Sequence, residues 1–369
     1  MEANTPSLNC MRVMIMAGGT GGHVFPALAV AKKLQQQQIS ISWLGTRKGI
    51  ESELIPQQGI ELHYLNVEGL RGRGLLALLR APFKLILSII QACSALTQFN
   101  PSVVLGMGGF VSGPGAIAAK LKGIPLVIHE QNSVAGTTNR LSAKLATRVM
   151  QGFPNTFNQA EHCGNPVRAE IEAIKPPLER LANRKGAMKL LVLGGSRGAL
   201  AINKLIPEAL AKIDPQKRPV VLHQVGDKHL QTTQEFYQAQ SLDVESNAIQ
   251  IVSFIDSMQE AYDWADFVIC RSGALTVAEL TAVGLGALLV PFPYAIDDHQ
   301  TTNAEWLVNG QAALMIQQRD ITPQGLADQI MSLANNPEQR LSMANHARSL
   351  AKNGAAERVA KVCMEVANV

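Results

Sequence analysis

The sequence predicts an α/β fold made of two Rossmann-like domains in tandem, each a parallel sheet covered by helices on both faces. Short apolar runs typical of buried parallel strands alternate with helical patterns along the whole chain. Gly-rich turns join several of these strands to the helix that follows. Two such turns, beginning at Gly18 and at Gly194, open the two halves in the same way, 176 residues apart.

Each predicted element rests on an apolar run or on the helical pattern after it. The expected elements of the first half are a strand at 12–17 with a turn at 18–23 and a helix to about 38, a strand at 103–105 with a turn at 106–115 and a helix at 116–122, and a strand at 125–129. Those of the second half are a strand at 190–193 with a turn at 194–198 and a helix to about 212, then strands near 220–225, 249–253, 267–270 and 287–291. This βαβα order predicts parallel strands with helical crossovers.

The domain boundary is expected near residues 164–168, where an Asn-Pro pair interrupts the pattern. The first domain then covers residues 1–165 and the second covers 166–344. A last helix is expected over about 344–367, so that the segment 345–369 returns to pack on the first domain.

The net charge of +4 is distributed unevenly between the two halves. Residues 1–165 carry 14 Lys and Arg against 7 Asp and Glu, whereas residues 166–369 carry 19 against 22. The first half is therefore expected to face something acidic. At 369 residues, the chain is long enough for two domains, each with its own core.

The five cysteines are scattered and show no CxxC spacing, which indicates a reduced, cytoplasmic protein without a cysteine metal site. The N-terminus shows only a short apolar run and no signal peptide. No stretch of about 18 uninterrupted apolar residues occurs, so no membrane-spanning segment is expected.

The most informative segment is 271–279, which follows the apolar run 267–270 and opens a helix. Free N–H groups at such a helix start suit a phosphate, and Glu279 on the second turn could accept from two ribose hydroxyls. The pattern thus fits a nucleotide diphosphate. The alternative is a tight strand-to-helix turn in which Ser272 caps the helix.

The turns match neither common nucleotide fingerprint. The first turn has Val24 where a dinucleotide site has Gly or Ala, and the second strand ends at 44–47 without the expected acid. No Walker A pattern occurs. Dehydrogenase and P-loop kinase functions are therefore disfavoured, and phosphate binding by glycine backbones remains.

His23 closes the first turn at the carboxyl end of a strand, where open α/β sheets place their ligands. Histidine titrates near neutral pH, so His23 is a candidate general base. The alternative is a histidine that only hydrogen-bonds the backbone at a helix start.

Residues 69–90 interleave leucines, Phe83 and Ile86 with basic residues and contain no acid. This pattern favours an amphipathic surface lying on anionic lipid, with an ordinary core helix as the alternative. The residues expected at the lipid are Arg71, Arg73, Leu75, Leu79, Arg80, Phe83 and Lys84.

Asp297, Asp298 and His299 could in principle bind a metal, but neighbouring side chains diverge in an extended loop, and no Asp-x-Asp occurs. A polar loop that meets a sugar through Gln300 is favoured, and neither a metal nor a cofactor is expected.

Taken together, these motifs resemble the bacterial MurG family over nearly the whole chain. The matching motifs occur in the family's order and spacing. They are residues 18–23, 129–132, 164–168, 194–199, 254–256 and 271–279. It implies a GT-B fold, with two Rossmann-like domains facing across a cleft. It also implies an inverting, metal-independent transfer of N-acetylglucosamine from UDP-GlcNAc to the C4 hydroxyl of the MurNAc-pentapeptide of lipid I, forming lipid II for peptidoglycan.

The resemblance also implies roles for residues, with His23 as the catalytic base. The donor UDP-GlcNAc would be bound by Thr20, Gly21, Gly22, Asn132, Arg168, Ser196, Ile255, Ala274, Leu275, Thr276, Val277, Ala278, Glu279 and Gln300. The lipid I pyrophosphate would be bound by Gly18, Gly19, Gly108, Gly109, Ser112 and Gly113.

The implied place of action is the cytoplasmic face of the bacterial inner membrane, bound peripherally, with cell-wall and division proteins as partners and no nucleic acid. Arg197, Phe110 and Thr301 depart from residues common in the family. Two other functions remain open. One is a UDP-sugar 2-epimerase on the same fold, and the other is a non-catalytic membrane scaffold for a glycosyltransferase.

Overall fold

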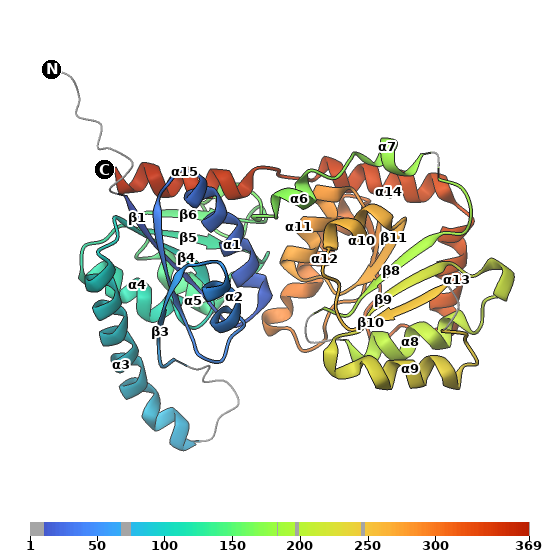
Figure 1. Cartoon of the computed structure of the whole chain (residues 1–369), viewed down its shortest axis with the longest axis horizontal. Coiled ribbons are helices and arrows are strands. Elements are labelled where there is room, and N and C mark those ends of the chain that lie inside the picture. Colours follow the sequence, from blue (N-terminus) through green and yellow to red (C-terminus); the bar gives the residue numbers. More distant parts are fainter. Residues whose placement is uncertain (1–10, 68–74, 183, 196–198, 245–247, 369) are drawn as a thin grey trace. The chain divides into compact units, whose positions relative to one another are not determined.

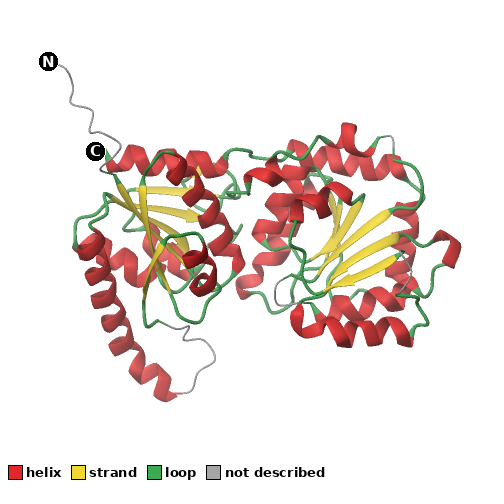
Figure 2. Cartoon of the chain, in the orientation of Figure 1, coloured by secondary structure: helices red, strands yellow, loops and turns green. Residues whose placement is uncertain are grey.

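The chain forms two compact units, which are described separately (Figures 1 and 2). The computed structural model describes residues 11–67, 75–182, 184–195, 199–244 and 248–368, with the side chains of 75–80 and 296 left aside. The first unit combines Met1–Arg168 with Gly354–Val369, and the second is Ala169–Asn353. The division thus falls three residues after the expected boundary.

The first unit contains a seven-stranded sheet in the order β3-β2-β1-β4-β5-β6-β7, and all its paired strands are parallel. Its strands are β1 (Arg12–Ala17), β2 (Ser40–Gly45), β3 (Glu61–Tyr64), β4 (Val103–Gly108), β5 (Leu126–Glu130), β6 (Arg148–Gln151) and β7 (Glu161–His162). Its helices are α1 (Gly21–Gln36), α2 (Glu51–Gln57), α3 (Leu75–Phe99), α4 (Ser112–Leu121), α5 (Thr137–Ala143) and α15 (Ala355–Ala367).

The two faces of this sheet are buried by different helices because side chains alternate along a strand. Val13 and Ile15 of β1 pack in one core with residues of α1 and α15, while Met14 and Met16 pack in a second core with residues of α3 and α4. Strands buried on both faces read as continuous apolar runs, which is why β1 was predictable.

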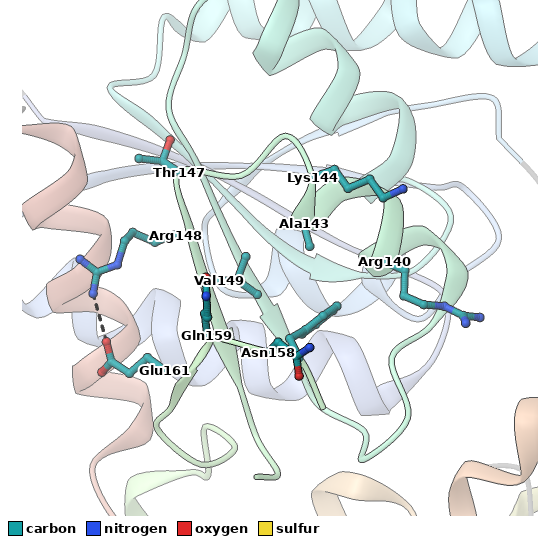
Figure 3. A pocket seen from close by; sticks show the side chains of 10 residues that line it. Arg140, Ala143, Lys144, Thr147, Arg148, Val149, Asn158, Gln159 and Glu161 are labelled. Atoms are coloured by element: carbon teal, nitrogen blue, oxygen red, sulfur yellow. Dashed lines mark hydrogen bonds and ion pairs between the residues drawn. The ribbon is translucent and has the colours of Figure 1, made fainter. Parts of the chain in front are cut away.

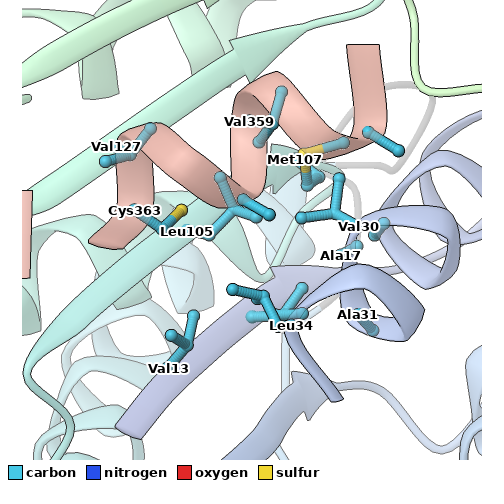
Figure 4. Close-up of a cluster of buried hydrophobic side chains, with 14 of the residues drawn as sticks. Val13, Ala17, Val30, Ala31, Leu34, Leu105, Met107, Val127, Val359 and Cys363 are labelled. Atoms are coloured by element: carbon cyan, nitrogen blue, oxygen red, sulfur yellow. The ribbon is translucent and has the colours of Figure 1, made fainter. Parts of the chain in front are cut away.

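The C-terminal helix completes the first of these cores. Figure 4 shows Val359 and Cys363 of α15 beside Val30 and Leu34 of α1. The expected single helix over 344–367 is in fact two helices. α14 (Pro337–Ser349) belongs to the second unit, and α15 begins after Gly354, whose φ of 76° ends helical continuity.

The second unit contains a six-stranded parallel sheet in the order β10-β9-β8-β11-β12-β13. Its strands are β8 (Lys189–Leu193), β9 (Val220–Gln224), β10 (Ile249–Val252), β11 (Phe267–Cys270), β12 (Ala287–Leu289) and β13 (Ala313–Met315). Its other α-helices are α6 (Ala169–Glu172), α7 (Pro177–Leu181), α8 (Leu200–Leu210), α9 (Leu230–Ala239), α10 (Met258–Trp264), α11 (Ala274–Val283), α12 (His299–Asn309) and α13 (Pro323–Ala334).

Both sheets reverse their strand order at the centre, between β1 and β4 in the first unit and between β8 and β11 in the second. Open α/β sheets bind ligands at such reversal points, beyond the carboxyl ends of the strands. The turns that follow these four strands are the Gly-rich turns singled out from the sequence.

Candidate active site

The two Gly-rich turns of the first unit lie against each other. A Cβ atom at Gly109 would lie 2.3 Å from the carbonyl oxygen of Gly18, and a Cβ atom at Gly108 would lie 2.7 Å from Nδ1 of His23. Gly108 and Gly109 also have φ values of 105° and 84°. Only glycine therefore allows the two turns to approach this closely beside the histidine.

Some hydrogen-bonding groups of these turns are satisfied within the protein. The N–H of Gly19 donates to the Glu51 carboxylate, and the buried Ser112 hydroxyl accepts from the N–H of Gly108 at 3.1 Å. The Ser112 hydroxyl can also donate to the carbonyl oxygen of Gly108 at 2.9 Å, and the Ser112 N–H donates to that of Gly109 at 3.3 Å, so both polar groups of Ser112 already have partners. Gly21 and Gly22 begin α1, and by helix geometry their N–H groups have no acceptor within the helix.

Glu51 is a functional candidate that the sequence analysis missed. Its side chain is fully buried, and its carboxylate accepts from the Gly19 N–H at 2.9 Å and from the Thr46 N–H and hydroxyl, each at 2.8 Å. It thereby ties the first Gly-rich turn to the end of β2. A Gly-Thr-rich loop before an acidic helix start was the only sequence signal.

His23 contacts a side chain that follows β5. The Nδ1 atom of His23 lies 2.8 Å from Oε1 of Gln131, and Nε2 of Gln131 lies 3.1 Å from Nδ1 of His129. His129 and Gln131 are buried, and burial lowers the pKa of His129 to about 4. His23 therefore does more than hydrogen-bond the backbone.

The loop after β5 is organised by a second buried carboxylate. Glu130 accepts from the N–H of Asn132 at 2.9 Å, from the N–H of Gly136 at 3.2 Å and from Nδ2 of Asn139 at 2.9 Å. The Asn132 amide also donates to it at 3.3 Å. Asn132 is thus held at the carboxyl end of the sheet, on the same strand end as Gln131.

In the second unit, α11 starts without a side-chain cap. Its N-cap is Gly273, and the Ser272 hydroxyl donates instead to the carbonyl oxygen of Gln300 at 2.7 Å. The alternative in which Ser272 caps the helix is therefore wrong. The first amides of α11, which belong to the expected donor residues 274–276, remain available to an anion.

Glu279 lies on the second turn of α11 and is 6% exposed. The hydroxyl of Tyr262, on α10, donates to its carboxylate at 3.0 Å. No sequence motif indicates this partner. Ile255 is half-buried in the loop after β10, whereas Ser196 and Arg197 fall outside the described residues.

Gln300 is also held in place, because its Oε1 accepts from the N–H of Phe292 at 3.0 Å. It follows two left-handed residues, Asp297 and Asp298, with φ of 53° and 49°. Asp298 accepts from the Thr301 hydroxyl at 2.7 Å. Among the residues the structure describes, no group of three or more His, Cys, Asp or Glu side chains could hold a metal ion.

The predicted lipid-facing segment coincides with α3. Arg71 and Arg73 lie outside the described residues, and Leu75, Leu79 and Arg80 lie where only the backbone is described. Beyond them, one side of α3 packs in the core through Ala92, Ala95 and Leu96. Nearer its start, residues 82–87 are exposed all round the helix, and the exposed large apolar side chains of α3 are Phe83 (76%), Leu85 (44%), Ile86 (55%), Leu87 (47%) and Ile90 (59%).

This helix also bears on the expectation that no segment spans a membrane, without contradicting it. Residues 81–99 form a 19-residue stretch with mean hydropathy 1.2, which by length and composition alone is sufficient to cross. Single helices of this kind also occur in proteins that do not cross a membrane. The exposed apolar residues of 82–87 do not fit a core helix with a basic outer face, whereas the later part of α3 does pack in the core.

A cavity of about 610 Å³ lies elsewhere in the first unit, beside β6 and β7 (Figure 3). Arg140, Lys144 and Arg148 contribute positive charge, and Arg148 pairs with Glu161 at 3.2 Å. None of the residues predicted from the sequence lines this cavity. It is therefore separate from the Gly-rich turns.

Comparison with known proteins identifies the family. Residues 13–151 match the glycosyltransferase family 28 N-terminal domain, and residues 189–365 match its C-terminal domain. The chain is 51% identical over 361 residues to the UDP-N-acetylglucosamine--N-acetylmuramyl-(pentapeptide) pyrophosphoryl-undecaprenol N-acetylglucosamine transferase of Nitrosococcus oceani, covering 97% of this chain and 99% of that protein. The crystal structure of MurG from Acinetobacter baumannii superposes with a TM-score of 0.82 at 40% identity, covering 96% and 99% of the two chains. The chain belongs to the MurG family.

Membership of this family establishes the GT-B fold, with its two Rossmann-like domains, and the glycosyltransferase class. A UDP-GlcNAc 2-epimerase from Neisseria meningitidis also superposes, with a TM-score of 0.64 but only 16% identity. That likeness shows a shared fold alone. The family match therefore follows from the sequence, not from the shape of the two domains.

Proposed function

We propose that the protein transfers N-acetylglucosamine from UDP-GlcNAc to the C4 hydroxyl of the MurNAc-pentapeptide of lipid I, with inversion, yielding lipid II. The observation that carries this proposal is the uncapped start of α11, with the buried carboxylate of Glu279 on its second turn. Backbone amides at a helix start bind phosphate, and a carboxylate one turn further suits a ribose. The relatives of half-identical sequence carry the name of this transferase.

The donor is assigned mainly to the second unit. The amides of 274–278, with Ser196, would hold the diphosphate, the Ile255 backbone would meet uracil, and Glu279 would bind the ribose. Tyr262 would orient that carboxylate through its 3.0 Å hydrogen bond. Gln300 would contact the donor sugar, together with Thr20, Gly21, Gly22 and Asn132 of the first unit.

The reaction is a direct displacement at C1 of the donor sugar. His23 would take the proton of the attacking C4 hydroxyl, a role typically worth ~10²–10⁴ in rate. Charge develops on the departing UDP, where the α11 amides and Arg168 would stabilise it. The lipid I pyrophosphate would lie on the turns containing Gly18, Gly19, Gly108, Gly109, Ser112 and Gly113, and the scheme requires no metal.

The acceptor is a lipid, so the site must reach a membrane surface. We assign this contact to the exposed apolar residues of α3 and to Arg71, Arg73, Arg80 and Lys84, the basic residues of the same stretch of sequence. The protein would then act at the cytoplasmic face of the inner membrane, where it could meet cell-wall and division proteins.

The decisive experiment incubates the protein with UDP-GlcNAc and a short-chain lipid I analogue, and measures both UDP and the disaccharide product. We expect UDP and disaccharide in equal amounts, and neither without the acceptor. Conversion of UDP-GlcNAc to its 2-epimer without acceptor would identify an epimerase instead. Absence of any donor turnover in the presence of lipid vesicles would leave the scaffold function.

A further inference from the structure

The strongest unassigned feature is a chain of three side chains at the carboxyl ends of β1 and β5. It runs from His23 through the amide of Gln131 to His129, and ends at the carbonyl oxygen of Gly164, which lies 2.9 Å from Nε2 of His129. All of these residues belong to the first unit. Gln131 is only 1% exposed, and Asn165 donates to its backbone oxygen at 2.9 Å.

The orientation of the Gln131 amide is fixed by a backbone carbonyl. The Nε2 atom lies 3.0 Å from the carbonyl oxygen of His129, which can only accept a hydrogen bond. Turning the amide over would place two oxygen atoms against each other. Oε1 of Gln131 therefore points to His23, and the second N–H of the amide points to Nδ1 of His129 at 3.1 Å.

Both histidine tautomers follow from this orientation. His129 is neutral above about pH 4, because burial lowers its pKa to that value. Its Nδ1 accepts from the Gln131 amide, so its proton is on Nε2 and is donated to Gly164. Since Oε1 of Gln131 can only accept, Nδ1 of His23 carries the proton of the neutral ring.

We propose that Gln131 is a positioning residue for catalysis, which holds His23 as the Nδ1–H tautomer and leaves its Nε2 lone pair to take the proton of the acceptor hydroxyl. The inference rests on the proposed function for its catalytic meaning, but the tautomer can be tested separately. In many active sites a general base next to the attacking group is oriented by a hydrogen bond to a third residue. Here the third group is a neutral amide.

The same arrangement suits the protonated ring. When the Nε2 of His23 takes a proton, Nδ1–H continues to donate to the amide oxygen, so the imidazolium keeps its partner without any movement of Gln131. The ring also lies close to the backbone of Gly108, where an added Cβ atom would come within 2.7 Å of Nδ1, so only glycine leaves room for it there. Orientation and tautomer are thus both set before substrate binds.

The first test reads the tautomer directly, by ¹⁵N NMR of the ¹⁵N-histidine-labelled full chain at pH 8, with His23→Gln to assign the signal. We expect the Nδ1–H tautomer of His23 in the wild type. In Gln131→Ala we expect a shift toward the Nε2–H tautomer that predominates in free histidine. An Nε2–H tautomer in the wild type, or no change in Gln131→Ala, would overturn the inference whatever the enzyme's substrate.

The second test uses kinetics with a matched control. Gln131→Ala should lower kcat about tenfold or more, as expected for a misoriented base, with the donor KM unchanged. Gln151 is a similarly buried glutamine at the end of β6, and its Oε1 accepts from the Phe157 N–H at 2.7 Å without contact to His23. Gln151→Ala should leave kcat unchanged. The comparison then separates misorientation of His23 from the packing that is lost when any buried glutamine is truncated.

The pH profile distinguishes positioning from a merely structural role. Gln131→Glu places a carboxylate beside the imidazolium, so the acidic limb of kcat/KM should move to higher pH, whereas Gln131→Ala should not move it upward. Unchanged kcat in Gln131→Ala, with a strongly impaired His23→Ala enzyme, would refute the positioning role. Full activity of His23→Ala would instead refute the base, and the NMR result would then decide whether Gln131 sets the tautomer.

Discussion

Removing the Glu51 carboxylate should weaken the first unit measurably, because its hydrogen-bond donors are left without an acceptor. In the folded protein the side chain is fully buried and accepts from two backbone N–H groups, those of Gly19 and Thr46, and from the Thr46 hydroxyl. The hydroxyl can rotate to another acceptor, but the two amides cannot. The expected damage is therefore set by these two buried donors.

The magnitude follows from the cost of burying an unsatisfied donor. Each such N–H costs about 1–3 kcal/mol, so Glu51→Ala should reduce the free energy of unfolding of the first unit by about 2–4 kcal/mol once partial entry of water is allowed for. Glu51→Gln keeps the shape and one acceptor oxygen, but turns an N–H group toward a donor. Its cost should be smaller, about 1–3 kcal/mol.

The assay is urea unfolding followed by the fluorescence of Trp43. This indole is fully buried in the first unit, and its Nε1 donates to the carbonyl oxygen of Ala17 at the end of β1. The other tryptophans, Trp264 and Trp306, lie in the second unit and should be replaced by Phe in all variants. The unfolding midpoint then reports the first unit alone.

Glu53→Ala supplies the matched control, because Glu53 is an exposed acid on the same first turn of α2. It should cost only about 0.3–1 kcal/mol through the helix dipole. Equal losses for Glu51→Ala and Glu53→Ala would refute the reasoning, since burial and hydrogen bonding would then make no difference. An unchanged unfolding midpoint in Glu51→Ala would refute it as well.

Four further outcomes are expected. Glu279→Ala should raise the KM for UDP-GlcNAc far more than it lowers kcat, because ribose is held equally in ground and transition states; an unchanged KM would remove the ribose assignment. Turnover should survive EDTA at neutral pH, and a loss restored by magnesium or manganese would reveal a metal requirement. Replacing Phe83 and Ile90 by Ser should release the protein from anionic vesicles but spare turnover of a short-chain acceptor, whereas Leu178→Ser, an exposed leucine of the second unit, should leave vesicle binding intact. Burial lowers the pKa of His129 from 6.5 to about 4, so the folded protein binds fewer protons than the unfolded chain in this interval. The free energy of unfolding, measured with urea, should therefore fall as the pH drops from 6.5 to 4. In the His129→Asn variant it should fall less steeply over the same interval.

The central strands could be predicted from the sequence because both of their faces are buried. The run 267–270 coincides with β11, and 12–17 coincides with β1. The edge strands β3 and β7 carry Glu61 and Glu161 and are at most half-buried, so no apolar run marks them. Edge strands lack one neighbour and therefore tolerate polar residues.

The glycine turns of the site could also be predicted, since a residue without Cβ is required where Gly109 meets Gly18. Their hydrogen-bond partners could not. Glu51 is 32 residues from Gly19, and Gln131 is 108 residues from His23. Tyr262 lies 17 residues before Glu279 on a different helix. Such pairs depend on strand order, which the sequence of one chain does not reveal.

The reversal points of the two sheets differ in which polar groups the protein itself satisfies. In the second unit Gly273 leaves the start of α11 uncapped, so its amides can take a charged diphosphate. In the first unit Glu51 already accepts from the Gly19 amide, which places a buried carboxylate behind the turn. Because that amide already has an acceptor, a phosphate could bind it only by displacing the carboxylate. The Gly19 amide is therefore taken within the protein, and the acceptor pyrophosphate would be bound by the other amides of the two Gly-rich turns.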